Sequence, residues 1–68
     1  MPKQKRWALK RQCDRTIEDI ERAQGHLVEV YAAFQPVHPA EAEYLQTMGW
    51  ALSDIAKAVR RFSDEVIG

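Results

Sequence analysis

The sequence has few residues that cross-link a chain or interrupt regular structure. It contains one cysteine, three glycines and three prolines among 68 residues, and ten basic side chains balance ten acidic ones. One cysteine cannot form a disulfide within the chain, and no charged-then-apolar signal segment opens it, so we expect a cytoplasmic protein. Its apolar runs are far shorter than the ~20 residues that cross a membrane, so we expect no membrane partner.

The length allows one small domain. A chain of this size buries only ~60% of the surface that it exposes when unfolded, so a lone monomer is expected to be marginally stable. Hydrophobic residues make up 46% of the chain, which argues against global disorder. We therefore expect residues 1–68 to form a single folded unit that gains stability by association.

Apolar or small residues recur at alternating intervals of three and four in two segments, the spacing of a heptad seam on a helix. In the first segment they are Leu9, Cys13, Thr16, Ile20, Ala23, Leu27, Val30 and Phe34. In the second they are Leu45, Met48, Leu52, Ile55, Val59, Phe62 and Val66. Pro36 and Pro39 separate the segments, so the pattern predicts helices at about 3–34 and 39–67 and a turn at about 35–38.

The short connection makes the two helices antiparallel neighbours. Folding the chain back between Val37 and His38 pairs the two seams in seven apolar layers, with Ile20 against Ile55 at the centre. The predicted fold is therefore all-α, an antiparallel two-helix hairpin with heptad packing. Because one seam buries little, we expect this hairpin to dimerise into a four-helix bundle.

Further apolar and small residues flank the predicted seam and are candidates for an interface with another chain. They are Ile17, Tyr31, Tyr44, Gly49, Trp50, Ala51, Ala56 and Ala58. Trp50 falls opposite the seam, where an exposed tryptophan favours a contact with a protein partner. The open end of the hairpin is basic and the turn end is acidic, so an antiparallel homodimer sets unlike charges together and is favoured over a turn-to-turn arrangement.

The sequence holds no constellation that predicts catalysis. Cys13, His26 and His38 are the only soft metal ligands, and they lie 13 and 12 residues apart, with no pair at helical ligand spacing. There is no Gly-rich phosphate loop and no nucleophile motif. We therefore expect no catalytic residue, no metal, no cofactor and no enzymatic activity.

A basic stretch near the start supports an alternative. Its residues are Lys3, Lys5, Arg6, Trp7, Lys10 and Arg11, a set of cations that can contact nucleic-acid phosphates while the tryptophan stacks on a base. The layout, together with the opening residues 1–10, resembles the Rop family of RNA-binding plasmid copy-control hairpins, which form antiparallel dimeric bundles. The Asn, Phe and Gln pattern of that family's RNA-contacting helix is not reproduced here, so the resemblance assigns no functional residue.

The leading interpretation is a small, non-enzymatic interaction or regulatory protein that self-associates and presents a surface to another macromolecule. The alternative is a nucleic-acid-binding dimeric bundle that uses the basic N-terminal end.

Overall fold

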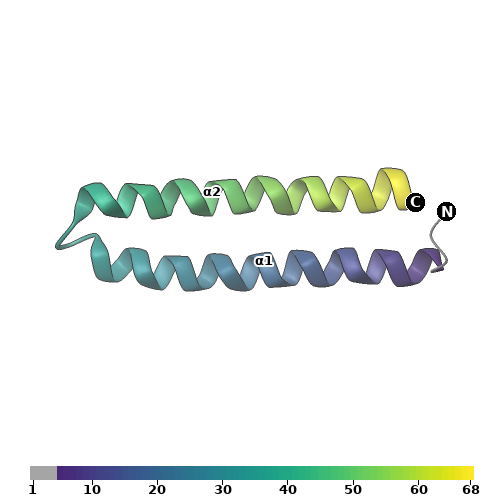
Figure 1. Ribbon diagram of the computed structural model, residues 1–68, viewed down its shortest axis with the longest axis horizontal. Coiled ribbons are helices and arrows are strands. Elements are labelled where there is room, and N and C mark those ends of the chain that lie inside the picture. Colours follow the sequence, from purple (N-terminus) through teal and green to yellow (C-terminus); the bar gives the residue numbers. More distant parts are fainter. Residues whose placement is uncertain (1–4) are drawn as a thin grey trace.

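The computed structural model describes residues 5–68, which form two antiparallel helices (Figure 1). Helix α1 spans Arg6–Phe34 and helix α2 spans Pro39–Phe62, followed by a single π-helical turn, η1, at Ser63–Ile67. The hairpin measures 50 × 15 × 15 Å. The predicted all-α hairpin is confirmed. Helix α1 begins at Arg6, and Lys5 before it has extended backbone dihedrals of φ −68° and ψ 152°; the start predicted at about residue 3 lies outside the described residues.

Two backbone hydrogen bonds close the turn, and a proline begins the helix that follows it. The N–H groups of Val37 and His38 both donate to the carbonyl oxygen of Phe34, at 3.1 and 2.6 Å. Pro39 then occupies the first position of α2, where a missing N–H leaves no bond unmade. Glu41 lies in the first turn of α2, where the helix dipole favours a negative charge. These local preferences fix where the chain reverses.

The seam between the helices matches the predicted one in part: the predicted seam residues Cys13, Ile20, Leu27, Leu45, Leu52 and Val59 are half-buried, whereas others are not. The most buried side chains are Ile17, Ala42 and Ser63, which are only 4%, 1% and 3% exposed. By contrast, the predicted seam residues Met48, Ile55 and Phe62 are 49%, 50% and 51% exposed. Each helix is therefore rotated, so that the inward position on α2 moves by one residue from a large side chain to a small one.

Small side chains explain this rotation. The inward line of α2 runs through Ala42, Gly49, Ala56 and Ser63 at heptad spacing, all buried or half-buried. Because these residues have little or no side chain, the backbone of α1 can come close to α2 along this line. Thr16, predicted in the seam of α1, is exposed instead, and its hydroxyl donates to the carbonyl oxygen of Gln12 on the same helix at 2.8 Å.

One side-chain hydrogen bond indicates which residues of α1 and α2 lie opposite each other. The Gln24 side chain donates from Nε2 to the carbonyl oxygen of Gly49 at 3.0 Å. Steps of one heptad from this pair bring Ile17 level with Ala56 and Tyr31 level with Ala42. Large residues of α1 thus lie opposite small residues of α2. The predicted fold-back places Ala51, not Gly49, opposite Gln24, so the true register lies two residues earlier on α2.

This seam predicts unequal costs for two apolar-to-alanine substitutions on α1. Ile17→Ala removes the most buried large side chain and should lower the free energy of unfolding by about 2–5 kcal/mol. Val28→Ala, at a position that is 65% exposed, should stay within about 0.5 kcal/mol of the wild type. Urea denaturation followed by circular dichroism at one protein concentration measures both. Equal losses would mean that Ile17 does not lie in the seam.

Candidate interaction surfaces

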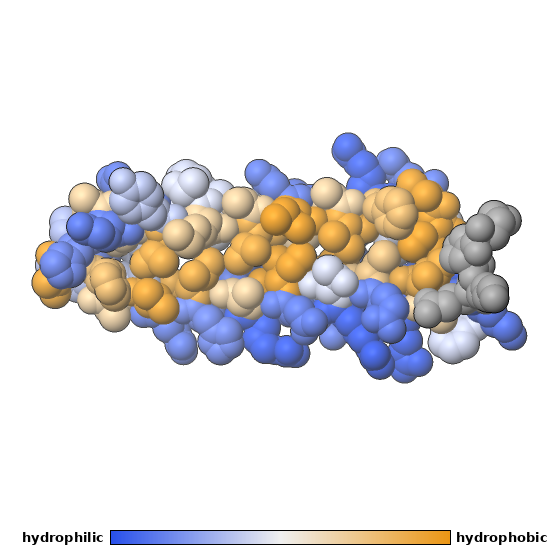
Figure 2. All heavy atoms as spheres, in the orientation of Figure 1, coloured by the Kyte–Doolittle hydropathy of each residue, from blue (hydrophilic) through white to orange (hydrophobic). Residues whose placement is uncertain are grey.

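Large apolar side chains line one flank of the hairpin and are not covered by it. We call this surface the apolar face; its exposed fractions run from 41% at Val30 to 67% at Val66. Its members are Val30, Phe34, Met48, Ile55, Phe62 and Val66. The space-filling view shows a continuous hydrophobic band along the line where the helices meet (Figure 2). Contiguous exposed apolar surface is a feature that interaction sites of proteins share.

The solvent-accessible surface of the hairpin is larger than that of a typical folded monomer of the same mass. A folded monomer of 7.9 kDa is expected to expose about 4,400 Å². The hairpin exposes 5595 Å², an excess of about 1,200 Å². A stable protein interface buries about 800 Å² from each partner, so the excess is enough for one interface of ordinary or larger size.

A second surface, the Trp50 groove, lies between the helices nearer the turn. The groove encloses about 390 Å³, within the ~300–1,000 Å³ range of ligand pockets. Its lining is mainly apolar, with three polar side chains. The residues are Gln24, Leu27, Val28, Tyr31, Leu45, Gln46, Gly49, Trp50 and Ser53.

Two features shape this groove. Trp50 is 63% exposed and forms part of its wall. Gly49 leaves space beside it, since a Cβ atom added there would meet nothing within 4 Å. The hydrogen bond from Gln24 to the Gly49 carbonyl ties the two helices together at this point.

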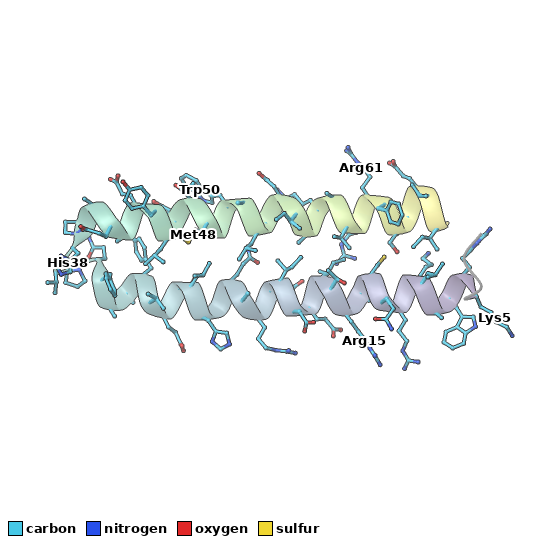
Figure 3. All side chains as sticks on the ribbon, viewed as in Figure 1. Lys5, Arg15, His38, Met48, Trp50 and Arg61 are labelled. Atoms are coloured by element: carbon cyan, nitrogen blue, oxygen red, sulfur yellow. The ribbon has the colours of Figure 1, made fainter. Side chains whose placement is uncertain are left out.

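The apolar face and the Trp50 groove lie on different sides of α2. In the view of Figure 3, Met48 lies at the edge of α2 nearer α1, whereas Trp50 projects from the opposite edge of α2. The two surfaces share no residue. Occupying one therefore leaves the side chains of the other in place.

The charges divide the hairpin along its length. Residues 5–11 carry four cations and no acid, whereas residues 23–56 carry four acids and no lysine or arginine. Outside the acidic stretch, Arg22 pairs with Asp19 at 3.1 Å and Arg61 with Glu65 at 3.9 Å, and within it Nδ1 of His38 lies 4.0 Å from a carboxylate oxygen of Glu41; all of these side chains are exposed. Such exposed pairs contribute little to the stability of the fold. The separation of basic and acidic residues along the hairpin therefore affects mainly which charged molecules it attracts.

The structure distributes the predicted interface residues over three places. Ile17, Gly49 and Ala56 face the other helix of the same chain. Half-buried Tyr31 and exposed Trp50 line the groove. The other three are exposed and each lies one helical turn before a member of the apolar face, on the same side of α2; they are Tyr44, Ala51 and Ala58.

Sequence reasoning did not single out the apolar partners of Trp50 as a groove. The heptad pattern places Leu45 in the seam and does not mark Val28. The signal that identifies them is the small residue at position 49, which opens space between α1 and α2 beside the tryptophan.

The predicted nucleic-acid contacts lie at the open end. Lys5, Arg6 and Arg11 are exposed, Trp7 is 61% exposed and Lys10 is half-buried. Lys3 falls outside the described residues. The basic side chains are thus accessible there, but the next turns of α1 carry Asp14, Glu18 and Glu21, which interrupt a continuous basic surface.

Within residues 5–68, no three histidine, cysteine or carboxylate side chains come together as a metal site. Neither helix of this described part combines the length and the apolar character needed to cross a membrane. Comparison with family models, curated proteins and solved structures gives no match for the chain.

Proposed function

We propose that the chain is a non-enzymatic interaction protein, a helical hairpin that self-associates through its apolar face and presents its remaining surface to another macromolecule. The apolar face is the observation that supports this proposal. Six large apolar side chains are at least 41% exposed along one side, and within residues 5–68 no large side chain is fully buried. A hairpin with this distribution has its main apolar surface outside.

A second copy fits the apolar face in size and chemistry. Fully burying a large apolar side chain contributes about 1.5–3 kcal/mol, so covering six half-exposed ones gains roughly 5–9 kcal/mol per protomer before the cost of association. The face follows the heptad positions that the sequence predicts for the seam, and in a bundle of four helices such positions point to the shared axis. The proposed assembly is a dimeric four-helix bundle.

Charge selects the orientation of the two hairpins. With the turns at opposite ends, the basic residues 5–11 of each protomer approach the acidic turn half of the other. With the turns together, like charges approach each other at both ends. We therefore take the dimer to be antiparallel.

The proposal predicts that association and folding are linked. The wild-type chain should sediment as a dimer at micromolar concentration, and its melting temperature should rise with protein concentration. Ile55→Glu places a charge at the centre of the apolar face and should abolish the dimer. Gln46→Glu, an exposed position on another side of α2, should leave it intact. Sedimentation velocity at several concentrations distinguishes them; a wild-type monomer with a concentration-independent melt would rule out self-association.

A second candidate function, nucleic-acid binding, is favoured by one observation: the exposed cations at the open end next to exposed Trp7. Such a site would contact phosphates through Lys5, Arg6 and Arg11. The acidic side chains on the following turns of α1 repel phosphates, so they prevent the basic site from extending further along the helix.

We expect no submicromolar binding of a labelled RNA or DNA 20-mer to the wild-type chain at about 150 mM salt, a concentration at which nonspecific phosphate contacts are weak. Fluorescence anisotropy across a salt series measures this. Tight binding that falls steeply with salt, and that disappears when Lys5, Arg6 and Lys10 are changed to glutamate with helix content unchanged, would instead support the nucleic-acid function.

A further inference from the structure

The Trp50 groove has the form of a site for a third helix. Two antiparallel helices leave a furrow between them, and here Gly49 widens it at a point walled by Trp50 and Val28. The lining spans residues 24–31 of α1, seven steps of 1.5 Å or about 10 Å along the helix. That length matches apolar side chains at positions i, i+4 and i+7 of a docked helix.

The surroundings of the groove specify the charge of its occupant. All its lining residues fall within residues 23–56, which carry Glu29, Glu41, Glu43 and Asp54 and no lysine or arginine. Glu43 and Asp54 lie on the same side of α2 as Trp50, two turns before it and one turn after it. Lys57, the first cation after the groove, lies two turns after Trp50 on the same side and one turn beyond Ser53, so one cation stands against these two carboxylates. The local field is negative, so it attracts a basic helix and repels a polyanion.

We propose that the Trp50 groove binds a basic amphipathic helix of a partner protein, with bulky apolar side chains against Trp50 and Val28 and lysine or arginine side chains toward the acidic rim. The inference rests on the proposed function in one respect: self-association uses the apolar face and leaves this groove open. Each copy in the dimer then carries its own groove.

The two tryptophans provide a matched pair of variants. Trp50 lines the groove and is 63% exposed; Trp7 is 61% exposed and lies at the other end of α1. Gly49→Leu gives a third variant. A Cβ atom at this position would meet nothing within 4 Å, and a leucine favours the helix more than glycine does. Because Gly49 also faces α1, a loss of binding in this variant is assigned to the groove only if its helix content and its thermal unfolding match those of the wild type.

The experiment titrates the full chain into two fluorescein-labelled 16-residue peptides and follows anisotropy. One peptide carries leucine at i, i+4 and i+7 with lysine elsewhere, and the other replaces every lysine with glutamate. We expect micromolar binding of the lysine peptide and at least tenfold weaker binding of the glutamate peptide. Trp50→Ala and Gly49→Leu should each weaken the lysine peptide at least tenfold, whereas Trp7→Ala should stay within twofold.

Several outcomes would overturn the proposal. They are equal affinity for the two peptides, equal losses for Trp50→Ala and Trp7→Ala, or no binding of the lysine peptide. Binding of an RNA hairpin that is lost on Trp50→Ala would assign the groove to nucleic acid instead.

Sedimentation of the same variants separates this inference from the proposed function. Trp50→Ala should remain a dimer. If that substitution dissociates the dimer, the groove is occupied by a second copy, and the peptide-binding proposal is wrong. If the peptides do not bind while the wild type remains dimeric, self-association through the apolar face stands and only the groove proposal fails.

Discussion

The line of small residues on the side of α2 that faces α1 determines what the rest of the molecule can do. Ala42, Gly49, Ala56 and Ser63 face inward beside half-buried Leu45, Leu52 and Val59 of the same helix, and Ile17 is the most buried large residue of α1. Because small residues occupy one line of the seam, Met48, Ile55 and Phe62 remain on the flank of α2. The small residues on the inward line of α2 therefore explain both the narrow contact between the helices and the broad exposed apolar flank.

Rotation of the helices also creates two separate surfaces. On one flank, Met48, Ile55 and Phe62 continue the apolar face; on the other, Gly49 and Trp50 shape the groove. In the proposed dimer the first flank becomes the bundle core and the second remains outside. Under these two proposals, the hairpin associates with itself and with a different helix at the same time.

Periodicity alone was enough to predict the helices and the turn, because proline and heptad spacing act locally. It could not predict the rotation. Ranking positions by hydrophobicity places Ile55 inward, whereas the hairpin brings in Ala56, one residue further. The reason is that a heptad stripe marks the side of a helix that is buried in the final assembly, and a two-helix contact covers only one edge of that stripe. The groove was missed for the same reason, since it depends on which edge is covered.

The arrangement of the second copy can be measured directly by energy transfer between protomers. Cys13→Ser removes the native cysteine. In that background, Val37→Cys places a dye at the turn, where Val37 is 71% exposed, and Asp64→Cys places a dye at the exposed open end. For an antiparallel dimer of a 50 Å hairpin, donor and acceptor both at 37 should transfer little, whereas donor at 37 and acceptor at 64 of the other protomer should transfer strongly. Strong transfer between the two turns, or no transfer in either pairing, would contradict the account.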